Sequence, residues 1–324
     1  MSKSVVYVGV DVGKVELWVS VEGRKVRMFH HTGHGVSGMV RWLRGVGDSQ
    51  RIQVCMESTG IYSRRLAIRL QRGSGLSVSI VNPLQIKSFR QVLLRRTKTD
   101  GVDAEVIRLY AQSQQPPEWH PGSAVQEELT SLVKQADRLR RLLIQSQNRG
   151  EHADGVSRVV RASERAVQRC LREQVAVVEG AIEGLCEQNE TLQEQVRLLC
   201  TIPGLGTKSA TQVLCYGGVP LQERSAKELT AHAGLAPCHR QSGISVRGRS
   251  RIAKQGDRRL RTALYMPTLV AVRANPALRT FYHHLIENGK AKKLALIACM
   301  RKLLIIIRAI LRTNRPFDAK LGLT

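Results

Sequence analysis

The hydrophobic pattern of the first third of the chain alternates between strand-like and helix-like segments. β-Branched apolar residues fill residues 5–12, and segments with a period of two continue to residue 29. Helical periodicity follows at 36–43 and 61–71, with short apolar strands at 52–56 and 76–81, and a further helix is expected from residue 100. Alternating strands and helices predict an α/β sheet domain, which we place at residues 1–122.

The middle of the chain, residues 123–199, is predicted to be helical, because apolar residues recur at alternating spacings of three and four. The first such run covers 129–143 and the second 171–199. Core positions of type a in the second run are Val175, Ile182, Asn189 and Val196, and those of type d are Val178, Leu185, Leu192 and Leu199. β-Branched residues at a, mostly leucine at d and one buried Asn predict a parallel coiled coil that joins two chains. The alternative is a helical hairpin within one chain, which would bury the same apolar stripes.

The last third, residues 200–324, is predicted to be mainly α-helical. Its richest apolar stretch, residues 294–311, contains Arg301, Lys302 and Arg308, so we do not expect it to cross a membrane. The apolar run near the start contains Asp11, which argues against a signal peptide. Seven scattered cysteines without a CxxC pair indicate reduced thiols rather than a zinc ribbon or a disulfide framework. We therefore expect a cytoplasmic protein.

Composition and charge indicate the partner. Of 324 residues, 51 are Lys or Arg and 26 are Asp or Glu, a net charge of +25. The three segments carry +9, −1 and +17 in chain order. Such an excess of positive charge indicates a polyanionic partner such as nucleic acid, because cations that neutralise phosphates release counterions. An anionic membrane surface is the second candidate partner. The 42% hydrophobic content excludes wholesale disorder, and 4% aromatic residues argue against recognition by many base-stacking platforms.

Four carboxylates in the first segment are candidate metal ligands. Asp11 ends the first strand between two glycines, Glu57 follows the strand at 52–56, and Asp100 and Asp103 lie three apart at a helix start. Brought to one sheet edge, these oxygen ligands would hold two Mg²⁺ ions. Alternatively, Asp100 caps the helix, Glu57 is an exposed turn residue, and the sequence GVDVG is a phosphate loop of the kind found in actin-like and sugar kinases.

Two features of the last segment are candidate phosphate contacts. The glycine-rich turn TIPGLG, followed by a helix, predicts a helix-hairpin-helix-like element in which Gly204, Gly206 and Lys208 face a phosphate; an ordinary interhelical turn is the alternative. Further along, one short segment has a local net charge of +7, opposed only by Asp257. Its cations are Arg240, Arg247, Arg249, Arg251, Lys254, Arg258, Arg259 and Arg261.

A serine inside this basic segment is a candidate nucleophile. Ser242 precedes a glycine among these cations, and a serine hydroxyl needs such a cradle, a base or a metal to attack a phosphodiester. On chemistry alone Ser245 and Ser250 are nearly as eligible, and a simple phosphate contact is the plainer interpretation.

Several motifs together resemble a known family. GVDVGK, CMESTGIY, RRTKTDGVDAEVIRLYA, TIPGLGTKSA and GLAPCHRQSGISVRGRSRIAKQGDRRLRTALY occur in the order found in the DEDD transposases of the insertion sequence 110 family, along nearly the whole chain. The resemblance implies a RuvC-like domain of the RNase H fold, a coiled coil and a C-terminal transposase domain. It also implies a metal-binding tetrad of Asp11, Glu57, Asp100 and Asp103, with Ser242 as the catalytic serine.

The resemblance implies an activity and partners as well. Members of the family insert and excise their own element in DNA, and several choose donor and target with a structured noncoding RNA. We expect a homodimer, or a dimer of dimers, that acts on double-stranded DNA with Mg²⁺ and a guide RNA. The rival hypotheses are a RuvC-like nuclease that hydrolyses with water and needs no serine, and a non-catalytic RNA-binding scaffold.

Overall fold

The computed structural model describes residues 5–46, 51–94, 97, 99–151, 157–218, 220–238, 241–242, 246–247, 251–252 and 255–319. Of these, residues 150–151, 220, 241–242, 246–247 and 251 are described by their backbone alone. The chain divides into two compact units, residues 1–121 and 122–324. Each unit is described by itself.

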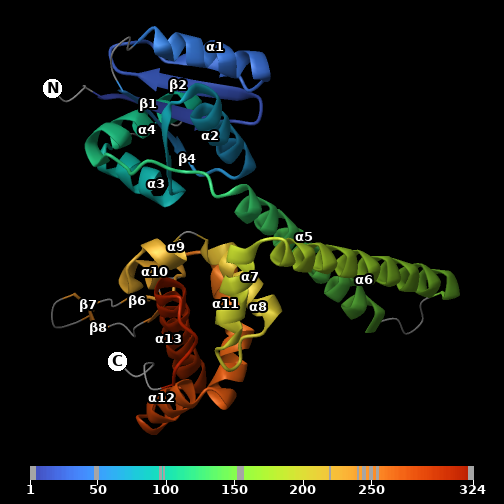
Figure 1. Ribbon diagram of the computed structural model, residues 1–324. Coiled ribbons are helices and arrows are strands. Elements are labelled where there is room, and N and C mark those ends of the chain that lie inside the picture. The colour runs from blue at the N-terminus through green and yellow to red at the C-terminus, as the bar shows by residue number, and fades with distance from the viewer. Residues whose placement is uncertain are drawn as a thin grey trace. The chain divides into compact units, whose positions relative to one another are not determined.

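The first unit is built on a five-stranded sheet of order β3-β2-β1-β4-β5. Figure 1 labels β1, β2 and β4 of this sheet. Strand β1 pairs antiparallel with β2 and parallel with β4, which pairs parallel with β5. Strands β1, β4 and β5 therefore end at the same side of the sheet, which we call the carboxyl edge. The strands are β1 Val5–Val12, β2 Glu16–Val21, β3 Arg27–His30, β4 Arg51–Glu57 and β5 Ser77–Val81.

Two pairs of helices cover the two faces of this sheet. Helices α1 (Gly33–Arg44) and α2 (Ile61–Ser74) pack on the face that carries Val8, Val10 and Val12. Helices α3 (Pro83–Val92) and α4 (Asp100–Gln114) pack on the opposite face, around Cys55. The predicted α/β sheet is confirmed, with α3 as an addition that begins at Pro83 and is capped by Asn82.

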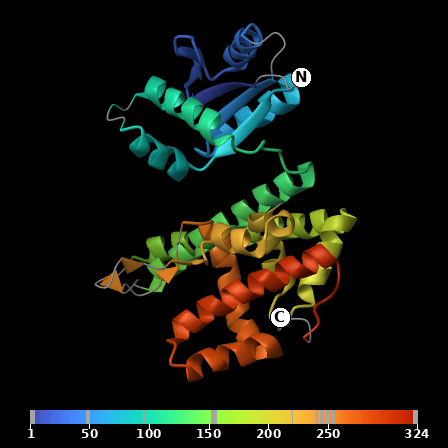
Figure 2. The same ribbon diagram turned by 90° about the vertical axis from the view of Figure 1, so that its left-hand side faces the viewer.

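The second unit is mostly helical (Figure 2). It has one continuous core, to which α5, α7, α8, α11 and α13 contribute buried residues. Two pairs of two-residue strands lie between α10 and α11. The elements are α5 Ala124–Glu151, α6 Arg158–Glu187, α7 Glu190–Cys200, α8 Thr207–Gly217, α9 Pro220–Glu223, α10 Ala226–His232, β6 Pro237–Cys238, β7 Gln241–Ser242, β8 Val246–Arg247, β9 Arg251–Ile252, α11 Arg258–Ala274, α12 Pro276–Glu287 and α13 Lys292–Thr313.

The apolar stretch near the end of the chain forms most of α13. Leu303, Leu304 and Ile307 on this helix are fully buried in the core of the second unit. Among the residues that the structure describes, no helix is long and apolar enough to cross a membrane.

The two heptad-like runs form a helical hairpin within one chain. Helices α5 and α6 lie side by side (Figure 1). Arg140 on α5 pairs with Glu179 on α6, while Ser146 donates to Glu164 at 2.6 Å, so the helices are antiparallel. This is the alternative that the sequence left open. Leu129 and Val196, from the segment predicted to be a separate coiled coil, share their core with Leu303.

The prediction that Asn189 occupies a core position of one continuous helix is wrong. Helix α6 ends at Glu187 and α7 begins at Glu190, with Asn189 as its N-cap. The Asn189 side chain accepts a hydrogen bond from the backbone N–H of Leu192 at 2.9 Å. An Asn side chain satisfies an otherwise unpaired N–H at a helix start, which favours a break at this position over a continuous heptad.

Candidate active site

Two of the four predicted acids are neighbours at the carboxyl edge. The parallel register pairs Val10 of β1 with Met56 of β4. The next residues along these strands are Asp11 and Glu57, so they lie on adjacent strand ends. This adjacency follows from parallel pairing, in which strand ends of one polarity meet at one edge of the sheet.

The same two acids lie on the face covered by α4. Asp11 pairs with Trp18 of β2, whose ring is 3.6 Å from where a Cβ on Gly101 of α4 would stand. Cys55 packs among buried α4 residues, and Glu57 follows it by two positions. Because side chains alternate between faces along a strand, Asp11 and Glu57 share the α4 face.

Helix α4 brings its first turn, with Asp100 and Asp103, to this edge. The start of α4 lies at Trp18 of β2. Further along α4, Arg108 donates to Ser20 of β2 at 3.3 Å, and Gln112 donates to Glu22 just after β2 at 3.2 Å. Helix α4 thus runs in the direction of β2, which is antiparallel to β1. The Thr99 side chain caps it by accepting from the backbone N–H of Val102. All four predicted acids thus belong to one edge and one face of the sheet.

The chemistry of this donor set fits a divalent cation, since carboxylate oxygens are the ligands that Mg²⁺ prefers in proteins. Among the described residues, however, no three acidic, His or Cys side chains are gathered closely enough to form a metal site. Asp103 is instead ion-paired with Arg90 of α3, and both side chains are mostly buried. Arg90 supplies the positive charge beside this carboxylate.

Three residues of this region were not found from the sequence. Arg90 lies on the helix that the pattern did not predict, and Arg108 is a buried cation that ties α4 to β2. Gly9 lies so close to α4 that a Cβ on it would meet the helix backbone. Gly9 did carry a signal, because an isolated glycine inside a strand often marks close approach of another backbone segment.

Ser242 belongs to the second unit, in one of the two-residue strands between α10 and α11. Its backbone lies in β7 and pairs with Val246 of β8; its side chain is outside what the structure describes. Arg247 and Arg251 likewise are placed by backbone alone, in β8 and β9, and the predicted Arg240, Arg249 and Lys254, with the rival Ser245 and Ser250, lie outside the described residues. Arg258 and Arg259 are exposed in the first turn of α11.

The residues just before α11 are held against the end of α10 by a close glycine contact. A Cβ on Gly256 would lie 2.2 Å from the backbone N of Gly234 and from the carbonyl oxygen of His232. The Asp257 N–H donates to that same carbonyl at 2.6 Å, and Arg261 donates to Ala233 at 2.9 Å. Burial, and then nearby Arg224, lower the pKa of His232, against an opposing effect of Asp257.

The glycine-rich turn joins α7 to α8. Gly204 has φ +100°, and a Cβ there would be 2.6 Å from the backbone N of Ala271 on α11. Gly204 is thus needed for packing, whereas a Cβ on Gly206 would meet nothing within 4 Å. Gly206 precedes the first turn of α8, where backbone N–H groups are available to a phosphate.

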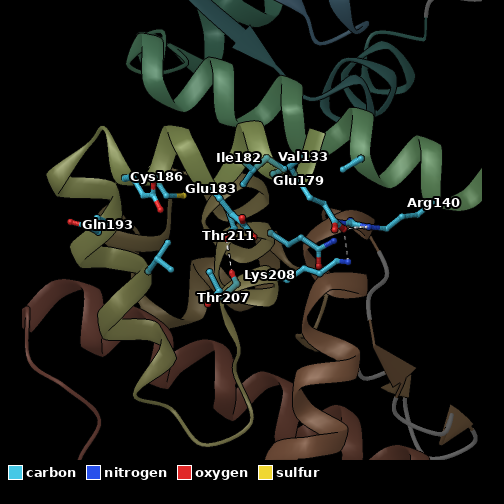
Figure 3. A pocket seen from close by; sticks show the side chains of 14 residues that line it. Val133, Arg140, Glu179, Ile182, Glu183, Cys186, Gln193, Thr207, Lys208 and Thr211 are labelled. Carbon is cyan, nitrogen blue, oxygen red and sulfur yellow. Dashed lines mark hydrogen bonds and ion pairs between the residues drawn. The ribbon is translucent and has the colours of Figure 1, made fainter. Parts of the chain in front are cut away.

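Lys208 borders a pocket of about 370 Å³ formed by α5, α6, α7 and α8 (Figure 3). Its Nζ lies 2.7 Å from Oε1 of Glu179, which also pairs with Arg140. Hydrogen bonds from Lys208 and then Arg140 lower the pKa of Glu179 below its ordinary range. The charge of Lys208 is therefore already compensated within the protein.

Comparison with known proteins decides the family. Residues 8–153 match a family model described as a transposase, of the DEDD type of IS110, and residues 196–283 match the model of the transposase IS116/IS110/IS902 family. The chain is 34% identical to the pilin gene-inverting protein of Moraxella bovis over 326 residues, covering 99% of each chain. It belongs to the IS110 family of transposases.

This transposase is also 34% identical to the pilin gene-inverting protein of Moraxella lacunata over 326 residues, which again covers 99% of each chain. An IS110 protein of 43.6 kDa from Streptomyces coelicolor is 28% identical over 145 residues, 42% of this chain and 36% of the relative. The first matched region includes all four acids, and the second includes Ser242. The transposase is an enzyme of a class that cleaves and rejoins DNA, and DEDD-type domains generally use divalent metal ions. The predicted family is confirmed.

Proposed function

We propose that this transposase cuts and rejoins double-stranded DNA with Ser242 as its nucleophile and with Asp11, Glu57, Asp100 and Asp103 as ligands of two Mg²⁺ ions in a RuvC-like domain. One observation carries the proposal: the adjacent ends of β1 and β4 and the first turn of α4 lie at one edge and on one face of the sheet. Carboxylate oxygens placed in this way are the ligands that Mg²⁺ prefers in proteins.

In the proposed reaction the Ser242 hydroxyl oxygen attacks the phosphorus of a phosphodiester. A bond forms between that oxygen and phosphorus, and the bond from phosphorus to one sugar oxygen breaks. The serine proton is released, and the leaving sugar oxygen takes up a proton to become a free hydroxyl. Bound Mg²⁺ would stabilise the charge that develops on the phosphate. The hydroxyl of another DNA strand then attacks the phosphoserine. This second step releases the serine hydroxyl and joins that strand to the transferred DNA end.

The nucleophile is tested by trapping the phosphoserine. Ser242→Ala should abolish strand exchange and the covalent protein–DNA adduct while nucleic-acid binding stays near that of the unchanged protein. Ser245→Ala is the matched control and should retain the adduct. An adduct that survives in the first variant and disappears in the second would move the nucleophile to Ser245. Cleavage without any adduct in the unchanged protein would favour the water-using nuclease.

The tetrad is tested by Asp11→Asn, which keeps the size of the side chain and removes its charge. We expect loss of Mg²⁺-dependent cleavage with DNA binding retained. Glu118→Gln is the control, because Glu118 pairs at 2.6 Å with Arg51 at the opposite end of β4. Full activity of Asp11→Asn would contradict the tetrad. Loss of all four carboxylates with no effect except on affinity would support the non-catalytic scaffold.

A guide RNA is part of the proposal, supported by the net charge of +17 in residues 200–324. The backbone N–H groups at Gly206 and the exposed Arg258 and Arg259 are its best-placed phosphate contacts, and Lys208 is a weaker one because Glu179 compensates it. Sequencing of nucleic acid that copurifies with the transposase tests this directly. Recovery of one structured RNA is the expected result, and random nucleic acid would contradict it.

We also propose a homodimer, or a dimer of dimers, through the α5–α6 hairpin. The hairpin leaves apolar side chains strongly exposed, including Ile144, Val159 and Val177. A contiguous patch of exposed apolar side chains marks an interface, and we take these residues to belong to such a patch. Light scattering should give the mass of a dimer for the unchanged protein and a lower mass for Val159→Glu, because a buried charge weakens the interface. Monomers of both proteins would contradict the proposed dimer.

DNA inversion is a second candidate activity. It is favoured by the relatives that match along 99% of their length, both named pilin gene-inverting proteins. A plasmid carrying a segment between inverted copies of a recombination site separates the two activities. Inversion without excision would favour this candidate, and excision followed by insertion elsewhere would favour transposition.

A further inference from the structure

His31 makes contacts that connect the turn after β1 with the start of helix α2. Its backbone N–H donates to the carbonyl of Val15 at 2.7 Å, and its Nδ1 lies 2.8 Å from the carbonyl oxygen of Gly13. Its ring meets the ring of Tyr62 edge-on, with centroids 6.1 Å apart. A carbonyl can only accept, so Nδ1 carries the proton in this contact.

Each contact touches a segment that follows a predicted metal ligand. Gly13 comes two residues after Asp11. It lies in a turn in which the Gly13 N–H donates to the backbone carbonyl of Glu16 at 2.9 Å. Tyr62 is in the first turn of α2, five residues after Glu57. His31 therefore spans from the turn after β1 to the helix after β4.

His31 itself is held firmly. It directly follows β3, whose last residue His30 pairs with Glu16, so β3 also ends at the carboxyl edge. The Thr32 N–H donates to the backbone carbonyl of His30 at 2.8 Å, and the Thr32 side chain caps α1. A Cβ on Gly35 would lie 2.0 Å from the carbonyl oxygen of His30, so α1 begins in close contact with this segment.

We infer that His31 is a positioning residue, which holds the turn after Asp11 against the first turn of α2, the helix that follows Glu57, in the relative placement that metal binding needs. The inference rests on the proposed function, because it takes Asp11 and Glu57 as ligands. A group that hydrogen-bonds a metal ligand directly typically changes metal affinity by about 10–100-fold when it is lost. His31 bonds the backbone two residues after Asp11, so we expect its effect at the lower end of that range. His31 acts through the backbone at Gly13 and does not need to touch the metal or the DNA.

Two variants separate the contacts of His31. His31→Phe keeps a ring for Tyr62 and removes the donor to Gly13, whereas His31→Asn keeps a donor near the position of Nδ1 and removes the ring. His34→Phe is the matched control, since His34 is exposed on α1 three residues away. Mn²⁺ affinity is measured by calorimetry on the full chain without DNA, alongside the Mg²⁺ dependence of cleavage and the thermal midpoint.

We expect His31→Phe to bind Mn²⁺ about tenfold more weakly and to need correspondingly more Mg²⁺ for half-maximal cleavage, with its thermal midpoint nearly unchanged. His31→Asn should keep most of the affinity, and His34→Phe all of it. Unchanged Mn²⁺ affinity in His31→Phe, or equal loss in the Phe and Asn variants, would overturn the inference. Asp11→Asn reports separately: if that variant binds metal and cleaves normally, the proposed function fails whatever His31 does.

Discussion

Gly9 of β1 lies directly against the backbone of α4 at Ala104. A Cβ on Gly9 would stand 2.1 Å from the Ala104 carbonyl oxygen and 2.3 Å from the Arg108 backbone N. A glycine therefore lets the helix backbone approach the strand this closely. Asp11 lies two residues after Gly9 near the end of β1, and Asp100 and Asp103 lie in the first turn of α4. This contact therefore influences how far Asp11 lies from Asp100 and Asp103.

Gly9→Ala should destabilise the protein and impair cleavage together. The added methyl group has to push α4 away from β1, and overpacking of this kind costs about 1–3 kcal/mol. Urea denaturation measures the free energy of unfolding. Gly38→Ala on α1 is the control, because a Cβ there would meet nothing within 4 Å; it should be neutral or stabilising by about 0.5–1 kcal/mol. Equal stability of the two variants would contradict the close contact.

Asn189→Ile distinguishes a helix cap from a coiled-coil core position. As the N-cap of α7, Asn189 accepts from Leu192, so its loss should destabilise the protein by about 1 kcal/mol. In a continuous coiled coil, the same change would replace a polar core residue with an apolar one and stabilise the dimer. Thermal unfolding decides the sign. Asn189→Ser, which keeps a capping side chain, should stay close to the unchanged protein.

The two glycines of the α7–α8 turn should respond differently to alanine. Gly204→Ala places a methyl group against Ala271 at a positive φ, so we expect a loss of about 1–3 kcal/mol in the free energy of unfolding. Gly206→Ala leaves packing intact, so any effect should appear in nucleic-acid affinity instead. A fluorescence binding assay and urea denaturation separate the two effects. Equal destabilisation by both changes would contradict the packing role of Gly204.

Glu179 should make stability depend on pH in the acid range. Lys208, and then Arg140, lower its pKa in the folded protein, so its stabilising effect is present above the unfolded value of about 4.3 and is lost as pH falls through the lowered folded value. The difference in thermal midpoint between the unchanged protein and Glu179→Gln should be constant above about pH 5 and shrink below it. Glu183→Gln, one turn further along α6, is the control for loss of a carboxylate from the same helix.

Much of the first unit could be predicted from local pattern. The strands before Asp11 and Glu57 and the helix at Asp100 were recognisable because burial on one face leaves a period of two or 3.6 in the sequence. Helix α3 was missed, and with it Arg90, which pairs with Asp103. The position of Arg90 in the sequence does not show that it pairs with Asp103, which lies on the next helix.

The second unit shows the limit of the same reasoning. The apolar stripes of α5 and α6 were visible, but a stripe does not say whether its partner is another chain or the same one. The structure pairs α5 with α6 in one chain, as Ser146 and Glu164 show, and places Asn189 at a helix start. The cap could be read from the sequence only after the helix boundary was known.

The sequence by itself determined the family, the strongly basic character and the four acids at strand ends and a helix start, because these depend on residue type and local periodicity. Tertiary structure decided that Asp11 and Glu57 lie on the face covered by α4, that Arg90 neutralises Asp103, and that His31 joins the turn after Asp11 to helix α2. These relations join residues that are distant along the chain. Parallel strand pairing, backbone approach at Gly9 and side-chain packing create them, and none of the three leaves a periodic signal in the sequence.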